Sequence, residues 1–98
     1  MTSKYYFIYI ACNSLNTVFY SGVINNLCRR IYQHKNRITD GFTSKYKINK
    51  LVYYELFESI NDAILRKKQI KGGSRQSKID LIRKENKGFK DLFEELCK

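Results

Sequence analysis

The stretch YYFIYIACNSLNTVFYSGV, residues 5–23, decides how this chain begins to fold. Residues 5–12 are mostly aromatic and β-branched, and the polar cluster at 13–16 follows them, which is typical of a strand that ends in a turn. Residues 17–23 have a similar strand-forming composition. The two segments therefore predict an antiparallel β-hairpin.

Two tyrosines mark this hairpin: Tyr9 ends the tripeptide FIY, and Tyr20 begins the tripeptide YSG. Gly22, the last residue of YSG, indicates that another group approaches the backbone of the second strand closely. Arg30 and His34 follow about one helical turn apart. Phenols, a guanidinium and an imidazole on one wall are suited to hold a phosphate ester.

The segment after the hairpin predicts a helix that runs to about residue 36. Asn25 or Asn26 can begin it, because an asparagine side chain accepts a hydrogen bond from the first free amides. At about 100° per residue, one stripe of this helix contains Leu27, Arg30, Ile31 and His34. Arg29 lies well away from that stripe. Of the two neighbouring arginines, only Arg30 is therefore expected to face the apolar residues.

Turn residues and periodicity place the remaining elements. We expect a basic loop over residues 36–50, a strand over 51–57, and helices over 59–71, 74–85 and 88–97. Ser59 or Asn61 can begin the helix that ends at about 71, and Ser74 can cap the next one. The apolar character of 51–57 favours the middle of a sheet, although alternating tyrosine and leucine would also suit an edge. The length predicts a single domain over residues 1–98, with a core at about 4–86 and a final helix at about 88–97.

The chain is strongly basic, with 19 Lys+Arg against 9 Asp+Glu and a net charge of +10. Such a balance favours a polyanionic partner, and nucleic acid is the first expectation. Residues 63–79 contain no acid, and their basic residues are Arg66, Lys67, Lys68, Lys71, Arg75 and Lys78. Both a phosphate-facing surface and an ordinary solvated helix face are consistent with this run. Membrane binding is not expected, because no basic stretch has a broad apolar opposite face.

The three cysteines, Cys12, Cys28 and Cys97, lie far apart and form no CxxC pair. This pattern predicts small buried or half-buried thiols, with neither a zinc site nor a disulfide framework. The apolar stretch near the N-terminus is too short for a signal peptide, and nothing approaches the roughly 20 apolar residues of a membrane span. A cytoplasmic protein is the expectation that follows.

Three longer stretches, together with the two tripeptides, carry a family resemblance. They are NNLCRRIYQHK at 25–35, GFTSKYKINKLVYYELFES at 41–59 and AILRKKQIKGGSRQSKIDLI at 63–82. Their order and spacing resemble the small stand-alone members of the GIY-YIG nuclease superfamily, which are related in fold to the N-terminal nuclease domain found in excinuclease ABC. The resemblance covers roughly residues 5–93.

The resemblance implies an α+β fold in which helices flank a three-stranded antiparallel sheet. Active members hydrolyse DNA phosphodiesters with one divalent metal ion, which implies Mg²⁺ or Mn²⁺ as the cofactor if this chain is active. By resemblance, Arg30 would neutralise the bound phosphate. Tyr9, Tyr20 or His34 would orient or deprotonate water, and the sequence does not rank these three groups.

Lys67 departs from the family pattern at the position that matters most for chemistry. It stands where the resemblance places a metal-binding glutamate, and no Asp or Glu occurs between Asp62 and Asp80 to replace it. An ammonium cannot ligate a hard cation. Lys67 lies within the apolar stripe predicted for the helix 59–71, which contains Ile60, Ala63, Ile64 and Ile70. It would either hold a phosphate or extend from that stripe to solvent.

The leading hypothesis is a nuclease-like protein that binds DNA and whose metal-dependent cleavage is impaired. Besides Arg30, the residues expected to contact nucleic acid are Gly22, Lys45, Lys47, Arg66, Lys67, Lys71 and Arg75. One alternative is an active endonuclease of the DNA repair or recombination type, with Glu55, Glu58 or Asp62 as a surrogate ligand. Another is a protein-binding adaptor, which would need an exposed apolar patch such as one on the helix predicted at 89–96.

Overall fold

The structure, a computed structural model, describes residues 5–36 and 41–97, and within them three strands and five helices form. In chain order these are β1 (Tyr6–Cys12), β2 (Phe19–Ile24), α1 (Leu27–Lys35), α2 (Phe42–Lys45), β3 (Lys50–Phe57), α3 (Ile60–Gly72), α4 (Arg75–Glu85) and α5 (Phe93–Leu96). The strands form one antiparallel sheet in the order β2-β1-β3. The α+β class and the predicted hairpin are both confirmed.

β1 is the central strand, and its residues 8–12 are all buried. Tyr9 lies opposite Gly22 of β2 on one side and opposite Tyr54 of β3 on the other. The middle position that the apolar residues of β3 favoured is wrong, and the alternative of an edge position is correct. The second half of β3 exposes Tyr54 and Leu56, which the alternation of side chains in an edge strand allows.

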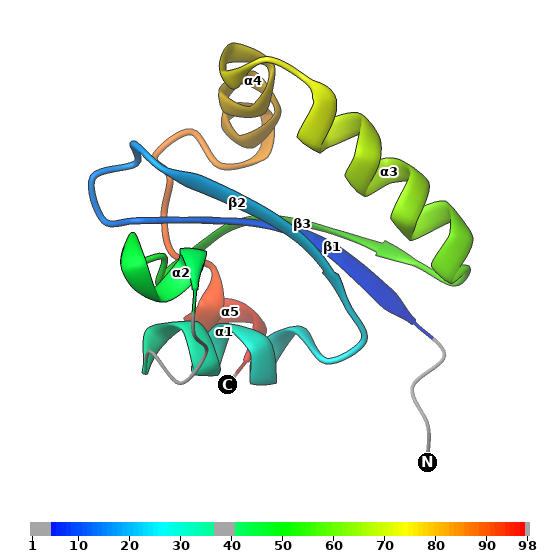
Figure 1. Ribbon diagram of the computed structural model, residues 1–98, viewed down its shortest axis with the longest axis horizontal. Coiled ribbons are helices and arrows are strands. Elements are labelled where there is room, and N and C mark those ends of the chain that lie inside the picture. Colours follow the sequence, from blue (N-terminus) through cyan, green and yellow to red (C-terminus); the bar gives the residue numbers. More distant parts are fainter. Residues whose placement is uncertain (1–4, 37–40, 98) are drawn as a thin grey trace.

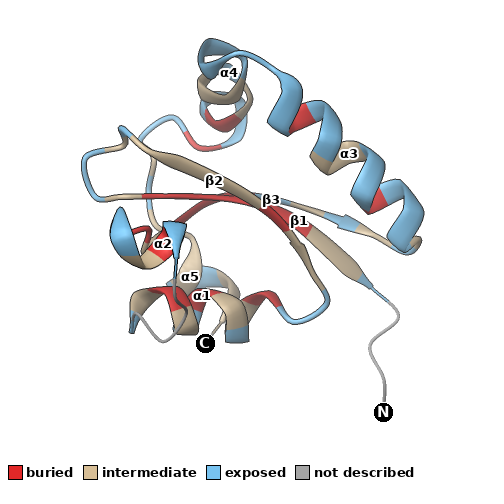
Figure 2. Cartoon of the chain, viewed as in Figure 1, coloured by how far each residue is buried: buried red, intermediate tan, exposed pale blue. Residues whose placement is uncertain are grey.

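Helices cover both faces of the sheet. Figure 1 shows α3 and α4 on one face, here called the α3 face, and α1, α2 and α5 on the other, here called the α1 face. The α3 face buries Ile8, Ile10, Cys12, Val52, Ala63, Ile70 and Ile82. The α1 face buries Tyr9, Ala11, Leu27, Ile31, Ile48 and Leu51. Burial is concentrated in β1 and the first half of β3, which lie between the two layers (Figure 2).

Side-chain caps begin three of the helices. The N-cap residues are Asn26 for α1, Ser59 for α3 and Ser74 for α4, and each side-chain oxygen accepts a hydrogen bond from the backbone N–H three residues later. This is the arrangement for which short polar side chains are favoured at helix starts. The predicted starts of these helices are confirmed.

α3 has a narrower buried stripe than predicted. Ala63 and Ile70 are buried, but Ile60 and Ile64 are exposed. Lys67, between the two buried residues on the same side of the helix, is half-buried. The helix therefore touches the sheet along a thin line, and its apolar residues outside that line face solvent.

The C-terminal helix is much shorter than predicted. α5 covers four residues, and Phe89 has a positive φ of 53°, which a helix does not allow. The buried Asn86 side chain holds this segment by donating a hydrogen bond to the carbonyl of Val52 in β3. Phe89 packs on the α3 face and Phe93 on the α1 face. The apolar residues at 89–96 are therefore spaced as in a helix, although they pack into two separate cores on opposite faces of the sheet.

The predicted basic loop contains a short helix. α2 is held by Thr43, which is buried, and by Ile48, which is also buried and whose N–H donates to the Thr43 carbonyl at 2.9 Å. Gly41 precedes α2 with a φ of +89°, a conformation that glycine adopts readily. Residues 37–40 of the predicted loop lie outside the described residues.

The prediction of three free thiols is wrong for two of them. Cys28 of α1 and Cys97 form a disulfide, with 5.5 Å between their Cα atoms. A separation of 69 residues gives no spacing signal in the sequence, and only the fold brings α1 and the C-terminal segment together. Cys12 is a buried free thiol as predicted, and burial raises its pKa to about 11.

None of the helices in the described part of the chain has the length and apolar character needed to cross a membrane.

Candidate functional site

The site is built on a buried contact between β1 and α1. The Tyr9 hydroxyl lies 3.1 Å from Nε2 of His34, and the two residues are only 3% and 4% exposed. Tyr9 donates in this hydrogen bond when Nε2 lacks a proton, and His34 donates when Nε2 carries it. Alternation along β1 and the helical stripe of α1 bring the two side chains together, as the sequence predicts.

Tyr20 forms an aromatic wall together with Tyr9 and His34, and it is the member of this wall that is partly exposed to solvent. Its ring centroid lies 6.2 Å from that of Tyr9 and 5.8 Å from that of His34, in an edge-to-face arrangement with the imidazole. On its other side the Tyr20 ring lies 6.1 Å from Phe42 of α2. Tyr20 is half-buried, so a ligand can reach the wall at this residue.

Gly22 makes room for this wall. A Cβ atom at Gly22 would lie 2.7 Å from Cε1 of Tyr9, its cross-strand partner, closer than real Cβ contacts allow. The predicted close approach to the backbone is therefore present, but the Tyr9 ring makes it. Gly22 is buried and packs beneath the site. Its predicted contact with nucleic acid stays a prediction.

Arg30 extends from the same helix as His34. It is half-buried, whereas its neighbour Arg29 is exposed, as the helical stripe predicts. The hollow at the start of α1, about 260 Å³ in volume, is lined by Ile24, Asn25, Asn26, Arg29, Arg30 and Gln33. The Arg30 charge acts on the pKa of both Tyr9 and His34. The guanidinium is thus electrostatically part of the aromatic site.

Burial sets the protonation states of this site. Burial lowers the pKa of His34 to about 4, and the Arg30 charge adds to the effect. Burial also raises the pKa of Tyr9 well above its usual value, with Tyr20 adding to the rise and Arg30 opposing it. At neutral pH the imidazole is therefore neutral and the phenol protonated. Of these two, His34 is the group that can accept a proton.

α3 brings lysines toward β2, the strand that carries Tyr20. Lys71 lies one turn after Lys67 on the helix and lines a hollow of about 420 Å³ together with Tyr20 and Ser21 of β2. Lys67 makes no hydrogen bond or ion pair with any described residue. The side of α3 that follows β2 is therefore basic at both positions.

The Arg66 side chain has a partner within the fold. Its Nη2 lies 2.9 Å and its Nε 3.0 Å from carboxylate oxygens of Glu55 on β3, and Tyr53 also donates to Glu55. Burial would raise the pKa of Glu55, but the hydrogen bonds from Arg66 and Tyr53 outweigh it and hold the pKa below its usual value. Arg66 forms an ion pair between α3 and β3. Its predicted contact with nucleic acid stays a prediction, made by a side chain that already has a carboxylate partner.

The residues around Lys67 do not fit a hard divalent cation. Such an ion needs carboxylate or other oxygen ligands, and residues 63–79 contain no Asp or Glu. Glu55 is engaged by Arg66 on the edge strand opposite β2, so it is not free to serve as a surrogate. Within the described ranges, no cluster of three or more His, Cys, Asp or Glu side chains could hold a metal.

The other predicted basic contacts lie around α2 and the start of α4. The Lys45 ammonium is 5.4 Å from the centroid of the Tyr46 ring, and the Arg75 guanidinium is 5.4 Å from that of the Phe19 ring. Lys47 is exposed. Aromatic rings position Lys45 and Arg75, a feature that no sequence pattern predicts.

Phe42 and Tyr46 are exposed residues near the site that are absent from the predicted set, whereas Lys78 belongs to the predicted basic run. The rings of Phe42 and Tyr46 lie 4.7 Å apart, and Lys78 lines two adjoining hollows beside Phe42. The four-residue spacing of the two aromatic residues is the signal that could have indicated a shared helical face.

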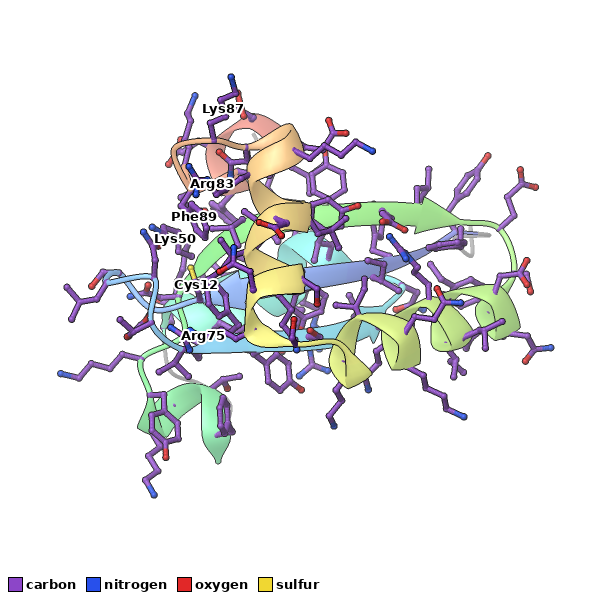
Figure 3. All side chains as sticks on the ribbon, turned by 90° about the horizontal axis from the view of Figure 1, so that it is seen from above. Cys12, Lys50, Arg75, Arg83, Lys87 and Phe89 are labelled. Carbon is purple, nitrogen blue, oxygen red and sulfur yellow. A yellow bond between two sulfur atoms is a disulfide. The ribbon has the colours of Figure 1, made fainter. Side chains whose placement is uncertain are left out.

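A further group of basic side chains lies along one side of α4. Viewed from above, it consists of Lys50, Arg75, Arg83 and Lys87 (Figure 3), and Lys50 pairs with Cys12 at the end of β1. Arg75 also adjoins the hollow beside Phe42. Positive charge therefore extends from the site toward this end of the molecule.

Comparison with known proteins identifies the family and agrees with the fold. The sequence model of the GIY-YIG catalytic domain matches residues 5–80. A UPF0213 protein of Staphylococcus saprophyticus is 32% identical over 79 residues, which is 81% of this chain and 94% of that protein. A UPF0213 protein of Clostridium perfringens is 40% identical over 63 residues, which is 64% of this chain and 68% of that protein.

A solved structure shares the architecture. The solution NMR structure of a UPF0213 protein from Bacillus halodurans has a TM-score of 0.57 and 22% sequence identity, covering 89% of this chain and 92% of that one. That likeness concerns the fold, whereas the domain match covers most of the sequence, including Tyr9, Tyr20 and Arg30. The chain belongs to the GIY-YIG family, as a nuclease-family domain similar to the UPF0213 proteins.

Proposed function

We propose that this protein binds DNA through a phosphate site at Arg30, and that its metal-dependent cleavage of DNA is impaired. The observation that carries the proposal is the Tyr9–His34 hydrogen bond beside the half-open Tyr20 ring, with Arg30 one helical turn before His34 on α1. A guanidinium offers a fixed fork of donors to phosphate oxygens. Tyr20 and His34 would border the bound phosphate.

Charge supports a nucleic acid as the ligand. The net charge of +10 attracts a polyanion over a long range, and the lysines along α3 and around α2 would contact neighbouring phosphates. Of the predicted contacts, the proposal rests on Lys45, Lys47, Lys67, Lys71 and Arg75. Because Arg30 is less exposed than most of these residues, it would hold the most specific phosphate.

We infer impaired cleavage because α3 has no carboxylate at the position where a metal ligand is expected. Lys67 supplies a positive charge where the resemblance places a carboxylate, so it can attract a phosphate but cannot bind a metal ion. Without that ion, water is not activated near neutral pH by metal coordination. His34 can accept a proton, but its Nε2 is already in a hydrogen bond with Tyr9. The residues present therefore favour binding over hydrolysis.

Binding is tested by comparing two neighbouring arginines. We expect Arg30→Ala to weaken binding of a labelled DNA by about 10- to 100-fold, the loss typical of a charge-assisted contact, in fluorescence anisotropy. Arg29→Ala removes the same charge from an exposed position and should cost only about 2- to 3-fold. Equal effects of the two variants, or an affinity that does not change with salt concentration, would contradict the phosphate site.

Cleavage is tested at Lys67. Wild-type protein should leave nicked and branched DNA intact with Mg²⁺ or Mn²⁺, and Lys67→Glu should introduce metal-dependent cutting. Lys68→Glu makes the same charge change at an exposed position and is the matched control. If the wild type cuts efficiently and Arg30→Ala abolishes cutting, the protein is an active endonuclease and impaired cleavage is the wrong conclusion.

One observation favours a second candidate, a protein-binding adaptor. The apolar residues of the predicted helix at 89–96 are half-buried and form no exposed patch. Exposed apolar side chains are instead found at the end of β3 and the first half of α3, and they are Leu56, Ile60, Ile64 and Leu65. Leu65→Glu should abolish binding of a protein partner there and leave DNA affinity unchanged. An unchanged partner affinity would argue against this candidate.

A further inference from the structure

A basic and aromatic groove begins where the phosphate site ends. Two adjoining hollows, of about 420 and 430 Å³, share Phe19, Phe42 and Lys78. Tyr20 lines the first hollow and Tyr46 the second. We call this surface the Phe42 groove. Its aromatic wall consists of Tyr20, Phe42 and Tyr46, and its basic wall consists of Lys71, Arg75 and Lys78.

Two rings of the aromatic wall, those of Phe42 and Tyr46, are exposed although the helix that carries them is anchored in the core. Phe42 is 46% exposed and Tyr46 is 40% exposed, with their centroids 4.7 Å apart. Buried Thr43 and Ile48 fix α2 beneath them. The protein fixes these rings on one side and leaves the other side open to solvent. A ligand can therefore pack on a flat apolar surface, and the side chains lose little conformational entropy on binding.

The basic wall indicates what kind of ligand this surface takes. The ammonium groups of Lys71 and Lys78 come from α3 and α4, and Arg75 lies over the Phe19 ring. Lys45, also on α2, lies over the Tyr46 ring. Aromatic planes between positive charges suit a ligand that combines flat bases with phosphates. The Lys78 ammonium also donates hydrogen bonds to the carbonyls of Lys71 and Gly73, which are neutral groups and leave its charge in place. A neutral apolar peptide would leave the charges of this wall without a counterion.

Base pairing decides which nucleic acid can use the rings. In a duplex each base is already stacked on its neighbours, so its flat face is not available to Phe42. An unpaired nucleotide exposes that face and can lie on an aromatic side chain whatever its sequence. We propose that the Phe42 groove is a stacking subsite for an unpaired nucleotide, next to the phosphate held at Arg30.

This inference rests on the proposed function and narrows it to a substrate class. Tyr20 belongs to both the phosphate site and the groove, because its ring contacts His34 on one side and Phe42 on the other. Because Arg30 is one helical turn from His34, a strand that crosses Tyr20 would therefore run from the α1 side of the site to Phe42. The preferred substrate is single-stranded DNA or a duplex with an unpaired segment.

The test compares a labelled single strand of about 12 nucleotides with a blunt duplex of the same length. Wild-type protein should bind the single strand at least about 10-fold more tightly in fluorescence anisotropy. Phe42→Ala should weaken single-strand binding by about 5- to 100-fold and leave duplex binding within about twofold. Phe42→Trp should preserve the preference. Tyr54→Ala removes a similarly exposed ring from β3, the opposite edge strand, and should change neither affinity.

Stacking itself has a separate signal. A 2-aminopurine base in the single strand should lose fluorescence when it binds to wild type or Phe42→Trp, and should not do so with Phe42→Ala. Thermal unfolding followed by circular dichroism checks that each variant is folded. If Phe42→Ala unfolds, Tyr46→Ala takes its place with the same expected loss.

The outcomes separate the two proposals. Equal affinity for single strand and duplex, or an equal loss on both with Phe42→Ala, overturns the stacking subsite while DNA binding at Arg30 stands. Failure of wild-type protein to bind any DNA overturns both. A single-strand preference that survives Phe42→Ala and Tyr46→Ala also overturns the stacking subsite.

Discussion

The two faces of the sheet hold their polar groups in different states. On the α1 face, Tyr9 and His34 form a neutral pair that is almost completely buried. On the α3 face, Glu55 and Arg66 form a charged pair whose side chains are 23% and 33% exposed. Burial of a charge is costly unless it is paired, whereas a neutral hydrogen-bonded pair can be buried deeply.

The difference bears on the proposal that this chain binds a phosphate without cleaving it efficiently. The resemblance takes the phosphate-binding residues from the α1 face and the metal-binding carboxylate from α3. On the α1 face Tyr9, Tyr20 and His34 lie together, while on α3 Lys71 lines a hollow with β2 and the carboxylate of Glu55 is engaged by Arg66. This contrast supports the proposal of binding without efficient hydrolysis, and four measurements can challenge or refine it.

The largest effect is expected from the disulfide that fastens the C-terminal segment to α1. Reduction or Cys28→Ser should lower the free energy of unfolding by about 4 kcal/mol, because the bond closes a loop of 69 residues in the unfolded chain. Urea unfolding with and without a reducing agent measures this. Cys28→Ser should then be insensitive to the reducing agent, and an unchanged wild-type midpoint on reduction would contradict the assignment.

Gly22→Ala should lower the free energy of unfolding of the protein by about 2 to 3 kcal/mol, through a steric clash on the α1 face. The new Cβ would lie 2.7 Å from the Tyr9 ring, which cannot move without losing its contact with His34. Gly72→Ala is the matched control, because nothing lies within 4 Å of a Cβ there, and it should be neutral or slightly stabilising. Equal thermal unfolding midpoints for the two variants would argue against the packing role of Gly22.

The neutral pair on the α1 face should make stability depend on pH. His34 has a pKa of about 4 in the folded protein and about 6.5 when unfolded, so the unfolded chain binds more protons between these values. Stability should be full above about pH 6.5 and fall by about 2 kcal/mol by about pH 5. His34→Gln should remove this part of the pH dependence in urea unfolding. If wild type and His34→Gln lose the same stability between about pH 6.5 and about pH 5, groups other than His34 cause the pH dependence.

The smallest change in the free energy of unfolding is expected from substitutions on the α3 face. A double-mutant cycle of Glu55→Gln and Arg66→Gln should give a coupling free energy of about 0.5 to 1 kcal/mol, since both side chains are partly exposed to solvent. Lys67→Gln should change stability by less than about 0.5 kcal/mol, because Lys67 makes no polar contact with the described residues. A larger change for Lys67→Gln than for Arg66→Gln would reverse this ranking.

Local signals in the sequence predict much of the fold and part of the site. Strand composition, the caps at Ser59 and Ser74, and the separation of Arg30 from Arg29 all depend on residues a few positions apart, and all are confirmed. Features that depend on distant segments are missed. The C-terminal spacing predicts a longer helix because sequence periodicity cannot tell that Phe89 and Phe93 enter different cores.

Three features follow from the amino-acid sequence without any tertiary contact: the hairpin, the stripe of α1 that carries Arg30 and His34, and the absence of a carboxylate at 63–79 on α3 and the start of α4. They depend on alternation, on helical periodicity and on residue identity. The folded structure was needed to find that Tyr9 fills the space above Gly22, that Glu55 engages Arg66, and that Cys28 meets Cys97. Each of these is a contact between segments separated in the chain, and such contacts form only when the cores on both faces of the sheet pack together.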